Sequence, residues 1–213
     1  GRVAVRPAEP VAPDAAIAVK TAARFVSRGG EKLDHALART GIDVAGLRCL
    51  DVGASTGGFT DCLLQRGAAR VVAVDVAYGE LASKVRDDAR VEVVERTNAR
   101  DLAPIDPPAD LGVMDVSFIS AATVLPALAR SVRPGGDMLV LVKPQFQAGR
   151  EAVQKGGVVR DPVVHAACVA KVALAAVELG LRVRGVVRSP LLGPAGNREF
   201  FLWLHKPEPG GAS

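Results

Sequence analysis

Short apolar runs alternate with amphipathic segments along most of this chain. Apolar runs bounded by turn residues predict buried strands, and apolar residues spaced three to four positions apart predict helices. The predicted strands lie near residues 48–52, 70–75, 91–95, 110–115, 137–142, 182–188 and 199–205. The predicted helices lie near residues 31–40, 58–66, 79–86, 120–131 and 161–179. This alternation predicts an α/β fold with a seven-stranded, mostly parallel sheet that carries helices on both faces.

The two ends of the chain differ from the middle. The last two predicted strands follow each other without a helix, which predicts an antiparallel end to the sheet. Before the first predicted helix, prolines separate two strand-like pieces that are too short to form a core. The residues after Lys206 are rich in proline and glycine and are expected to be disordered. We therefore expect one folded domain over residues 23–207, an appendage over 1–22 and a tail over 208–213.

The segment from Cys49 to Thr60 carries the most informative polar pattern. An apolar run ends in an acid, turns through a glycine-rich loop and enters a predicted helix. Glycines let such a loop bend sharply and approach a ligand closely. A dinucleotide-binding loop would have its second glycine where Ser55 stands, so that interpretation weakens. The loop instead resembles the acid-Val-Gly-x-x-x-Gly-Gly loop of S-adenosylmethionine (SAM) methyltransferases, which have a Rossmann-like fold. An ordinary tight turn between a strand and a helix is the alternative. The candidate cofactor-binding residues in this segment are Asp51, Gly53, Ser55, Thr56, Gly57, Gly58 and Phe59.

A second acid supports a cofactor site. Asp75 ends the next apolar run, 24 residues after Asp51 (75 − 51 = 24). In doubly wound folds, an acid at the tip of the second strand accepts hydrogen bonds from ribose hydroxyls. Asn98 follows the third predicted strand, where it could meet the edge of an adenine. Turn residues are the alternative interpretation of both, because aspartate and asparagine are common in turns.

Charged residues also stand at the ends of three other apolar runs. Asp115 ends the fourth predicted strand, Lys143 directly follows the fifth, and Glu199 begins the last. Ligands bind outside the carboxyl ends of parallel strands, so all three should approach the rim that holds the glycine loop. A lysine directly after four apolar residues is costly unless it is paired or used in catalysis. Taken singly, Asp115 can be a helix cap, Lys143 a snorkelling surface residue and Glu199 a surface strand residue. Together the three favour catalysis.

Composition agrees with one enzyme domain and excludes several classes. The 213 residues are 49% hydrophobic and 4% aromatic, with a net charge of +4 and a pI of about 9.2. This mild basic bias permits a phosphate-rich partner. The three cysteines have no Cys-x-x-Cys pair and are expected to be core residues of a reducing compartment, the cytoplasm. The three histidines lack ligand spacing, so no metal site is expected. No apolar run approaches the ~18 residues of a membrane span, and no signal peptide opens the sequence.

Several motifs together resemble the TlyA (haemolysin A) family, ribosomal RNA 2′-O-methyltransferases related to the FtsJ/RrmJ class. The resemblance covers about residues 24–206. The motifs that carry it are Ser27-Arg28-Gly29-Gly30-Glu31-Lys32-Leu33, Asp51 through Thr60, Glu95-Arg96-Thr97-Asn98-Ala99-Arg100, Asp115-Val116-Ser117-Phe118-Ile119-Ser120, Val142-Lys143-Pro144-Gln145-Phe146, Gly156-Gly157-Val158-Val159 with Asp161-Pro162, and Gly196-Asn197 with Glu199-Phe200. The resemblance implies SAM as cofactor, S-adenosylhomocysteine as product and a cytidine of ribosomal RNA, alone or in ribosomal subunits, as substrate.

The family's Lys-Asp-Lys-Glu catalytic tetrad falls on Lys32, Asp115, Lys143 and Glu199. Asp115 is also a candidate cofactor ligand. The resemblance further implies an N-terminal S4 RNA-binding domain, of which residues 1–22 would be a remnant and linker.

The implied reaction needs a ribose hydroxyl held in line with an activated methyl group and relieved of its proton. Lys143 is the residue expected to act as the base or to orient the hydroxyl. An ordinary lysine amine has a pKa of about 10.4, so a base needs desolvation or a nearby cation, for which Lys32 is the candidate. Asp115 and Glu199 would orient the two ammonium groups and oppose that effect. A role for Lys143 as a fixed cation therefore stays open.

Two other classes of function compete with this one. A membrane-lytic protein, suggested by the haemolysin name, would need a spanning segment, a basic amphipathic helix or a secretion signal, and none is visible. A non-catalytic SAM- and RNA-binding module for ribosome assembly would not need all four polar tetrad residues.

Overall fold

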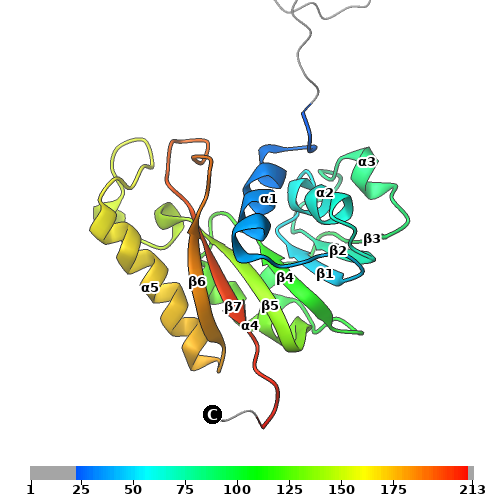
Figure 1. Ribbon diagram of the computed structural model, residues 1–213. Coiled ribbons are helices and arrows are strands. Elements are labelled where there is room, and N and C mark those ends of the chain that lie inside the picture. The colour runs from blue at the N-terminus through cyan, green and yellow to red at the C-terminus, as the bar shows by residue number, and fades with distance from the viewer. Residues whose placement is uncertain (1–22, 211–213) are drawn as a thin grey trace, which may run out of the picture.

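The computed structural model describes residues 23–210, and these form an α/β fold around one seven-stranded sheet (Figure 1). The strand order is β3-β2-β1-β4-β5-β7-β6. The strands are β1 (Arg48–Val52), β2 (Arg70–Val74), β3 (Val91–Val94), β4 (Ala109–Met114), β5 (Val132–Val142), β6 (Arg182–Arg188) and β7 (Phe200–His205). The α-helices are α1 (Arg28–Thr40), α2 (Gly58–Gln65), α3 (Ser83–Arg86), α4 (Ala121–Ser131) and α5 (Pro162–Glu178). Short 3₁₀ turns are η1 (Ala99–Asp101), η2 (Pro144–Phe146) and η3 (Arg150–Ala152).

The sheet is parallel except at β7, as the sequence predicts. β1 pairs in parallel with both β2 and β4, so the strand order reverses on either side of β1. The loops that leave β1 and β4 therefore start beside each other and diverge, which opens a crevice at the carboxyl ends of the strands. β7 runs antiparallel between β5 and β6. The loops that follow β5 and β6 lie at the top of Figure 1, above this edge of the sheet.

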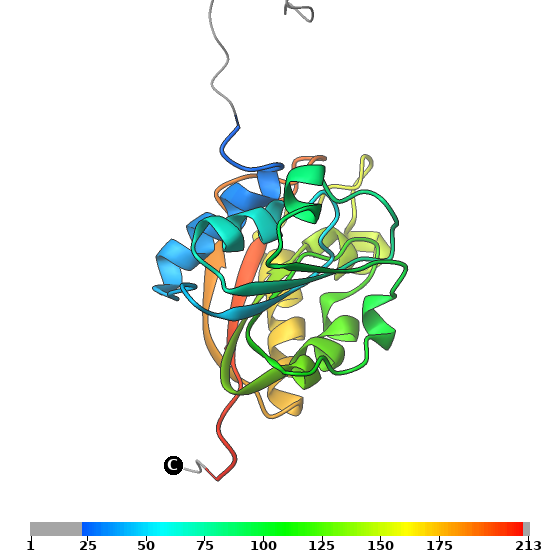
Figure 2. The same ribbon diagram turned by 90° about the vertical axis from the view of Figure 1, so that its right-hand side faces the viewer.

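Helices cover both faces of the sheet, which confirms the prediction (Figure 2). An apolar layer lies between the helices and the sheet on each face. On one face, α1 and α2 bury residues such as Leu33 and Leu63 against Val71 of β2. On the other face, α4 and α5 bury Leu125 and Val172. The pattern follows from strand geometry, because successive side chains of a buried strand point to opposite faces.

The predicted helix over 79–86 is wrong in its first half, since α3 covers only Ser83–Arg86. Gly79 has φ +76°, and its backbone N–H donates to Glu95 Oε1. The N–H of Ala82 donates to Thr56 O of the glycine loop. The N–H groups of these residues are thus hydrogen-bonded to neighbouring segments, so they are not available for the hydrogen bonds of a longer helix.

Other predicted boundaries shift by a few residues. α1 begins at Arg28 rather than near 31, and β5 begins at Val132 rather than near 137. α1 ends at Gly41, whose φ of 72° lets its N–H return to Leu37 O. The predictions for residues 1–22 and 211–213 lie outside the described residues.

Candidate active site

Two adjoining cavities lie at the carboxyl edge of the sheet. The first has a volume of about 830 Å³ and the second about 490 Å³. Five residues line both of them: Gly53, Ser55, Asp115, Ser117 and Phe118. Of the predicted residues, the first cavity also takes Lys32, Thr56, Gly58, Phe59, Lys143 and Glu199. The second also takes Asp75 and Asn98. Asp51 and Gly57 line neither of these two cavities.

The glycine loop is shaped by close backbone contacts. Gly53 has φ 86°, and a Cβ added there would lie 2.5 Å from the carbonyl oxygen of Asp115. The N–H groups of Gly53 and Ala54 both donate to Val74 O, at 2.9 and 3.1 Å, which ties the loop to the tip of β2. A larger residue at 53 would push the loop away from β4. The turn thus places backbone that carries no Cβ at residue 53 at the wall shared by both cavities.

Asp75 is held in one orientation at the second cavity. Its Oδ2 accepts a hydrogen bond from Ser55 N at 2.7 Å, and its Oδ1 accepts one from Ala77 N at 2.8 Å. Each carboxylate oxygen has a second lone pair, so the group can still accept hydrogen bonds from a pair of ligand hydroxyls. This is the arrangement that the sequence predicts for a ribose-binding acid.

Asn98 lies at the other wall of the second cavity and also caps η1. Its Oδ1 accepts a hydrogen bond from Arg100 N at 3.1 Å, and the residue is exposed. The turn interpretation of Asn98 is therefore confirmed, and its cofactor role stays a prediction. Its amide NH₂ has no hydrogen bond within the described chain and is open to a ligand acceptor.

Asp51 lies beneath the loop with no exposed surface. Thr60 Oγ1 donates to its Oδ2 at 2.7 Å. Burial raises the pKa of the Asp51 carboxyl to about 7, with a smaller contribution from the Asp115 charge, while the bond from Thr60 lowers it. Asp51 thus supports the loop through the start of α2 rather than by contact with the cavity.

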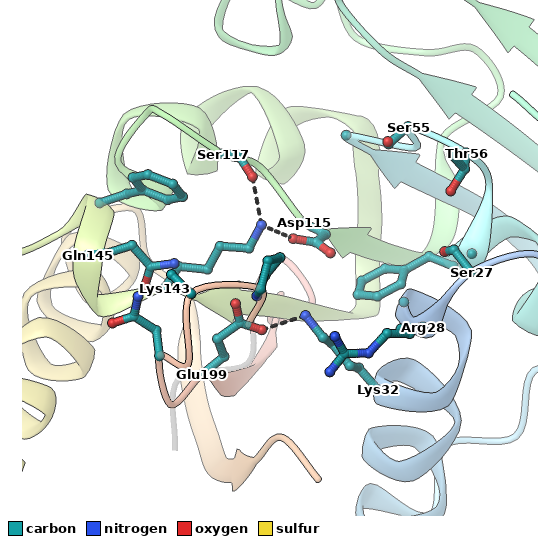
Figure 3. A pocket seen from close by; sticks show the side chains of 18 of the residues that line it. Ser27, Arg28, Lys32, Ser55, Thr56, Asp115, Ser117, Lys143, Gln145 and Glu199 are labelled. Carbon is teal, nitrogen blue, oxygen red and sulfur yellow. Dashed lines mark hydrogen bonds and ion pairs between the residues drawn. The ribbon is translucent and has the colours of Figure 1, made fainter. Parts of the chain in front are cut away.

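Lys143 reaches the wall between the two cavities. Its Nζ lies 2.6 Å from Asp115 Oδ1 and donates to Ser117 Oγ at 2.8 Å (Figure 3). An ammonium group has three N–H donors: one is donated to Ser117 Oγ, and the ion pair with Asp115 covers a second side of the group without hydrogen-bond geometry. One donor therefore remains for a ligand oxygen in the cavity.

Lys32 and Glu199 form a second ion pair on the opposite side of the first cavity (Figure 3). Lys32 Nζ lies 2.5 Å from Glu199 Oε2, and their side chains are only 9% and 1% exposed. The pair joins α1 to the segment before β7, across 167 positions of the chain. The four predicted tetrad residues are thus brought to one cavity as two separate pairs.

Buried acceptors without hydrogen-bond donors gather around the first cavity. Within the described chain these are Asp115 Oδ1, Gln145 Oε1 and Glu199 Oε1, all on residues that line it. The contact of Asp115 Oδ1 with Lys143 is an ion pair that lacks hydrogen-bond geometry. Buried polar atoms of this kind are normally satisfied in folded proteins. The site therefore fits a ligand that carries N–H and O–H donors, as the amino acid end of SAM and a ribose both do.

Sequence reasoning assigned no role to two side chains at this wall. Ser117 is a direct partner of Lys143. Phe118 has φ 63°, its side chain is among the most exposed apolar ones at 92%, and its ring centroid lies 5.2 Å from that of Phe146. A phenylalanine in the left-handed region is uncommon, and such strain collects at functional sites. The sequence feature that could have identified both residues is their position two and three residues after Asp115.

Residues 23–210 contain neither a metal-binding cluster nor a membrane-spanning helix. No group of three or more metal-ligating side chains occurs there. No helix of that range is long and apolar enough to cross a membrane.

Comparison with known proteins places this site in a family. Residues 25–206 match the family described as FtsJ-like methyltransferase. A relative from Mycobacterium tuberculosis, named 16S/23S rRNA (cytidine-2′-O)-methyltransferase TlyA, is 55% identical over 208 residues, 96% of this chain and 78% of that protein. A solved protein from Lactococcus lactis that carries a hemolysin name is 45% identical, with a TM-score of 0.81 over 85% of this chain and 88% of that one.

A more distant structure shares the fold alone. The N-methyltransferase NodS of Bradyrhizobium japonicum, solved with S-adenosyl-L-homocysteine, has a TM-score of 0.61 over 85% of this chain and 89% of its own, at 15% identity. The glycine loop, the acid at the tip of β2 and the family match over residues 25–206 agree on SAM as the cofactor. The chain belongs to the family of FtsJ-like methyltransferases.

Proposed function

We propose that this protein transfers a methyl group from SAM to the ribose 2′-hydroxyl of a cytidine in ribosomal RNA. The observation that carries the proposal is the position of Lys143, whose amine stands at the wall between the two cavities. The Mycobacterium tuberculosis relative is named for the same reaction.

The second cavity is the proposed site for the adenosine part of the cofactor. Asp75 accepts hydrogen bonds from the ribose hydroxyls, and the amide of Asn98 donates to the adenine edge. The exposed backbone of the loop from Gly53 to Gly58 faces the amino acid end. The five residues common to both cavities then flank the reacting methyl, and the first cavity receives the RNA.

SAM, when bound, supplies a methyl group that is already activated on a sulfonium. The task left to the protein is to hold the acceptor hydroxyl in line and to take up its proton. We assign the free N–H of the Lys143 ammonium to the lone pair of the 2′-oxygen. A hydroxyl that is gaining a methyl group becomes strongly acidic, so a carboxylate is a sufficient proton acceptor. Asp115, in contact with the same ammonium, takes that role.

Lys32 and Glu199 hold the far wall of the first cavity in this proposal. A buried ion pair is rigid because separating the partners leaves an uncompensated charge. Glu199 Oε1 is then available to the neighbouring ribose hydroxyl or amide donor of the substrate. Phe118 offers an exposed ring at the mouth, on which the target base can stack.

We further propose that residues 23–207 form the catalytic domain and that residues 1–22 and any preceding segment add RNA contacts. The residues lining both cavities lie between Ser27 and Glu199, so cofactor binding requires only this part. A net charge of +4 supplies few phosphate contacts, and weak binding to free RNA is expected from this chain alone.

The direct test is incubation of the purified protein with SAM and 16S rRNA, 23S rRNA or isolated subunits, followed by mapping of methylated nucleotides by mass spectrometry. We expect 2′-O-methylcytidine in at least one substrate. SAM binding without methyl transfer to any of them would overturn the proposal and leave a non-catalytic SAM- and RNA-binding module. Binding of NAD in preference to SAM would overturn the cofactor site as well.

A further inference from the structure

A third cavity lies behind the reaction site, between α5 and the strands β6 and β7. Its volume is about 530 Å³. Three arginines, Arg160, Arg188 and Arg198, stand around it, and no acidic residue is among those that line it. Its floor contains the buried His165 ring and the ring of Phe200, whose centroids are 5.6 Å apart. The cavity therefore combines three positive charges with an aromatic floor.

These three arginines have no protein anion to neutralise them. Within residues 23–210, none of the three lies in ion-pair distance of a carboxylate, and all three are exposed. Several other arginines of the same range are paired, among them Arg66 with Asp34, Arg90 with Asp88 and Arg133 with Asp110. Asp161 is next to Arg160 in sequence, but its carboxylate caps α5 by accepting from Val163 N at 2.8 Å. Guanidinium groups without a carboxylate partner suit phosphate oxygens, which they bind through two parallel hydrogen bonds.

The arginine cavity and the reaction cavity share a wall. Asn197 and Glu199 line the reaction cavity, whereas Arg198 and Phe200 line the arginine cavity. The side chains alternate between the two sides of one stretch of backbone, as in any extended segment. The wall is completed by Val159, whose N–H donates to Asn197 Oδ1 at 2.9 Å and whose carbonyl oxygen lies 2.8 Å from His165 Nε2. One peptide segment thus separates the proposed target ribose from the arginines.

We propose that the arginine cavity binds the RNA strand that flanks the target nucleotide, with a phosphate among the three guanidinium groups and a base over the aromatic floor. This inference rests on the proposed function, since it extends the path of the same substrate. Charge complementarity and the shared wall favour RNA over an acidic protein segment. Flanking contacts of this kind position the strand without reading its sequence.

The test compares Arg160→Gln, Arg188→Gln, Arg198→Gln and the triple variant with the parent protein. Arg184→Gln is the matched control, because Arg184 is on the same strand as Arg188 but lies over Trp203, which packs with the opposite face of the sheet. Binding of the rRNA that serves as substrate is measured across a salt series. KM for that RNA and kcat are measured in the methylation assay, and SAM affinity is measured by calorimetry.

We expect the triple variant to flatten the slope of log K against log salt by ~0.7, the value for one phosphate contact to a single strand. KM for RNA should rise roughly tenfold or more at 0.15 M salt, with kcat, SAM affinity and the control unchanged. An unchanged slope and KM in the triple variant would overturn the inference and favour an acidic protein partner. Parent protein that methylates no RNA would instead mark failure of the proposed function.

Discussion

The two halves of the candidate active site, at the carboxyl edge of the sheet, are built in different ways. The cofactor half comes mainly from residues 51–98, with the segment from Asp115 to Phe118 completing its wall, and it works through backbone shape and single acids held by N–H groups. The reaction half combines α1, the tips of β4 and β5 and the segment before β7, and it works through two charge pairs. The first half depends on local geometry, whereas the second depends on the complete sheet. Substitutions should therefore affect affinity in one half and turnover or stability in the other.

The largest effect is expected at Lys143, which we predict to control turnover alone. Lys143→Ala should lower the methyl transfer rate about 10³-fold, because the hydroxyl loses its orienting donor. SAM affinity, measured by calorimetry, should change little. Lys155→Ala is the control, since that exposed lysine lies in the following loop and lines neither the reaction cavity nor the cofactor cavity.

Lys143→Arg sharpens the same prediction. It should also lose most activity, because a guanidinium fork cannot make the Asp115 and Ser117 contacts from the same place. Near-normal activity in this variant would show that a positive charge at residue 143 suffices and that the geometry of its contacts with Asp115 and Ser117 does not matter. A matching loss of SAM affinity in Lys143→Ala would contradict the separation of the two halves.

The second effect concerns stability. Lys32→Met should lower the free energy of unfolding by about 3 kcal/mol, because Glu199 would remain as a buried charge without a partner. The double variant Lys32→Met/Glu199→Gln should recover most of that loss. Urea unfolding of the two variants and the parent measures both values. Equal stability of the single and double variants would mean that the pair is not coupled in the folded protein.

The third effect lies in the cofactor half. Asp75→Ala should weaken SAM binding at least about tenfold, because two charge-assisted hydrogen bonds to the ribose are lost. Calorimetry measures the change, and Asp87→Ala, at an exposed aspartate after α3, serves as control. Unchanged affinity would remove Asp75 from the cofactor site.

The smallest effect concerns Asp51 and depends on pH. Its carboxyl has a pKa of about 7 in the folded protein and an ordinary value of 3.8 when unfolded. Between these values the folded state binds the extra proton, so this group's contribution to stability falls as pH rises through that window. Asp51→Asn should therefore raise the free energy of unfolding at pH 8 by on the order of 1 kcal/mol. The gain should be smaller at pH 5 and should vanish only below pH 3.8, where the carboxyl is protonated in both states. Thermal unfolding at pH 8 and pH 5 checks the decrease. A gain of equal size at both pH values would assign it to another cause.

The sequence was sufficient for the seven strands, for the antiparallel end of the sheet and for the residues that reach the carboxyl edge. Apolar runs followed by a charge identify strand tips, and α/β folds collect those tips at one edge. It could not show that Asp51 lies beneath the loop or that Arg198 and Glu199 face different cavities. Burial depends on packing of distant segments, and the face of a short extended segment depends on its register with β5 and β6. The helix expected over 79–82 failed for a similar reason, since Gly79 and Ala82 bond to distant residues.

The late position of β7 in the chain has a consequence for synthesis. β7 inserts between β5 and β6, two strands that are made earlier, and Glu199 directly precedes it. As the chain leaves the ribosome amino end first, the cofactor half is complete long before the partner of Lys32 exists. Among the elements that build the reaction cavity, the segment before β7 is therefore synthesised last, and the Lys32–Glu199 pair can form only after it.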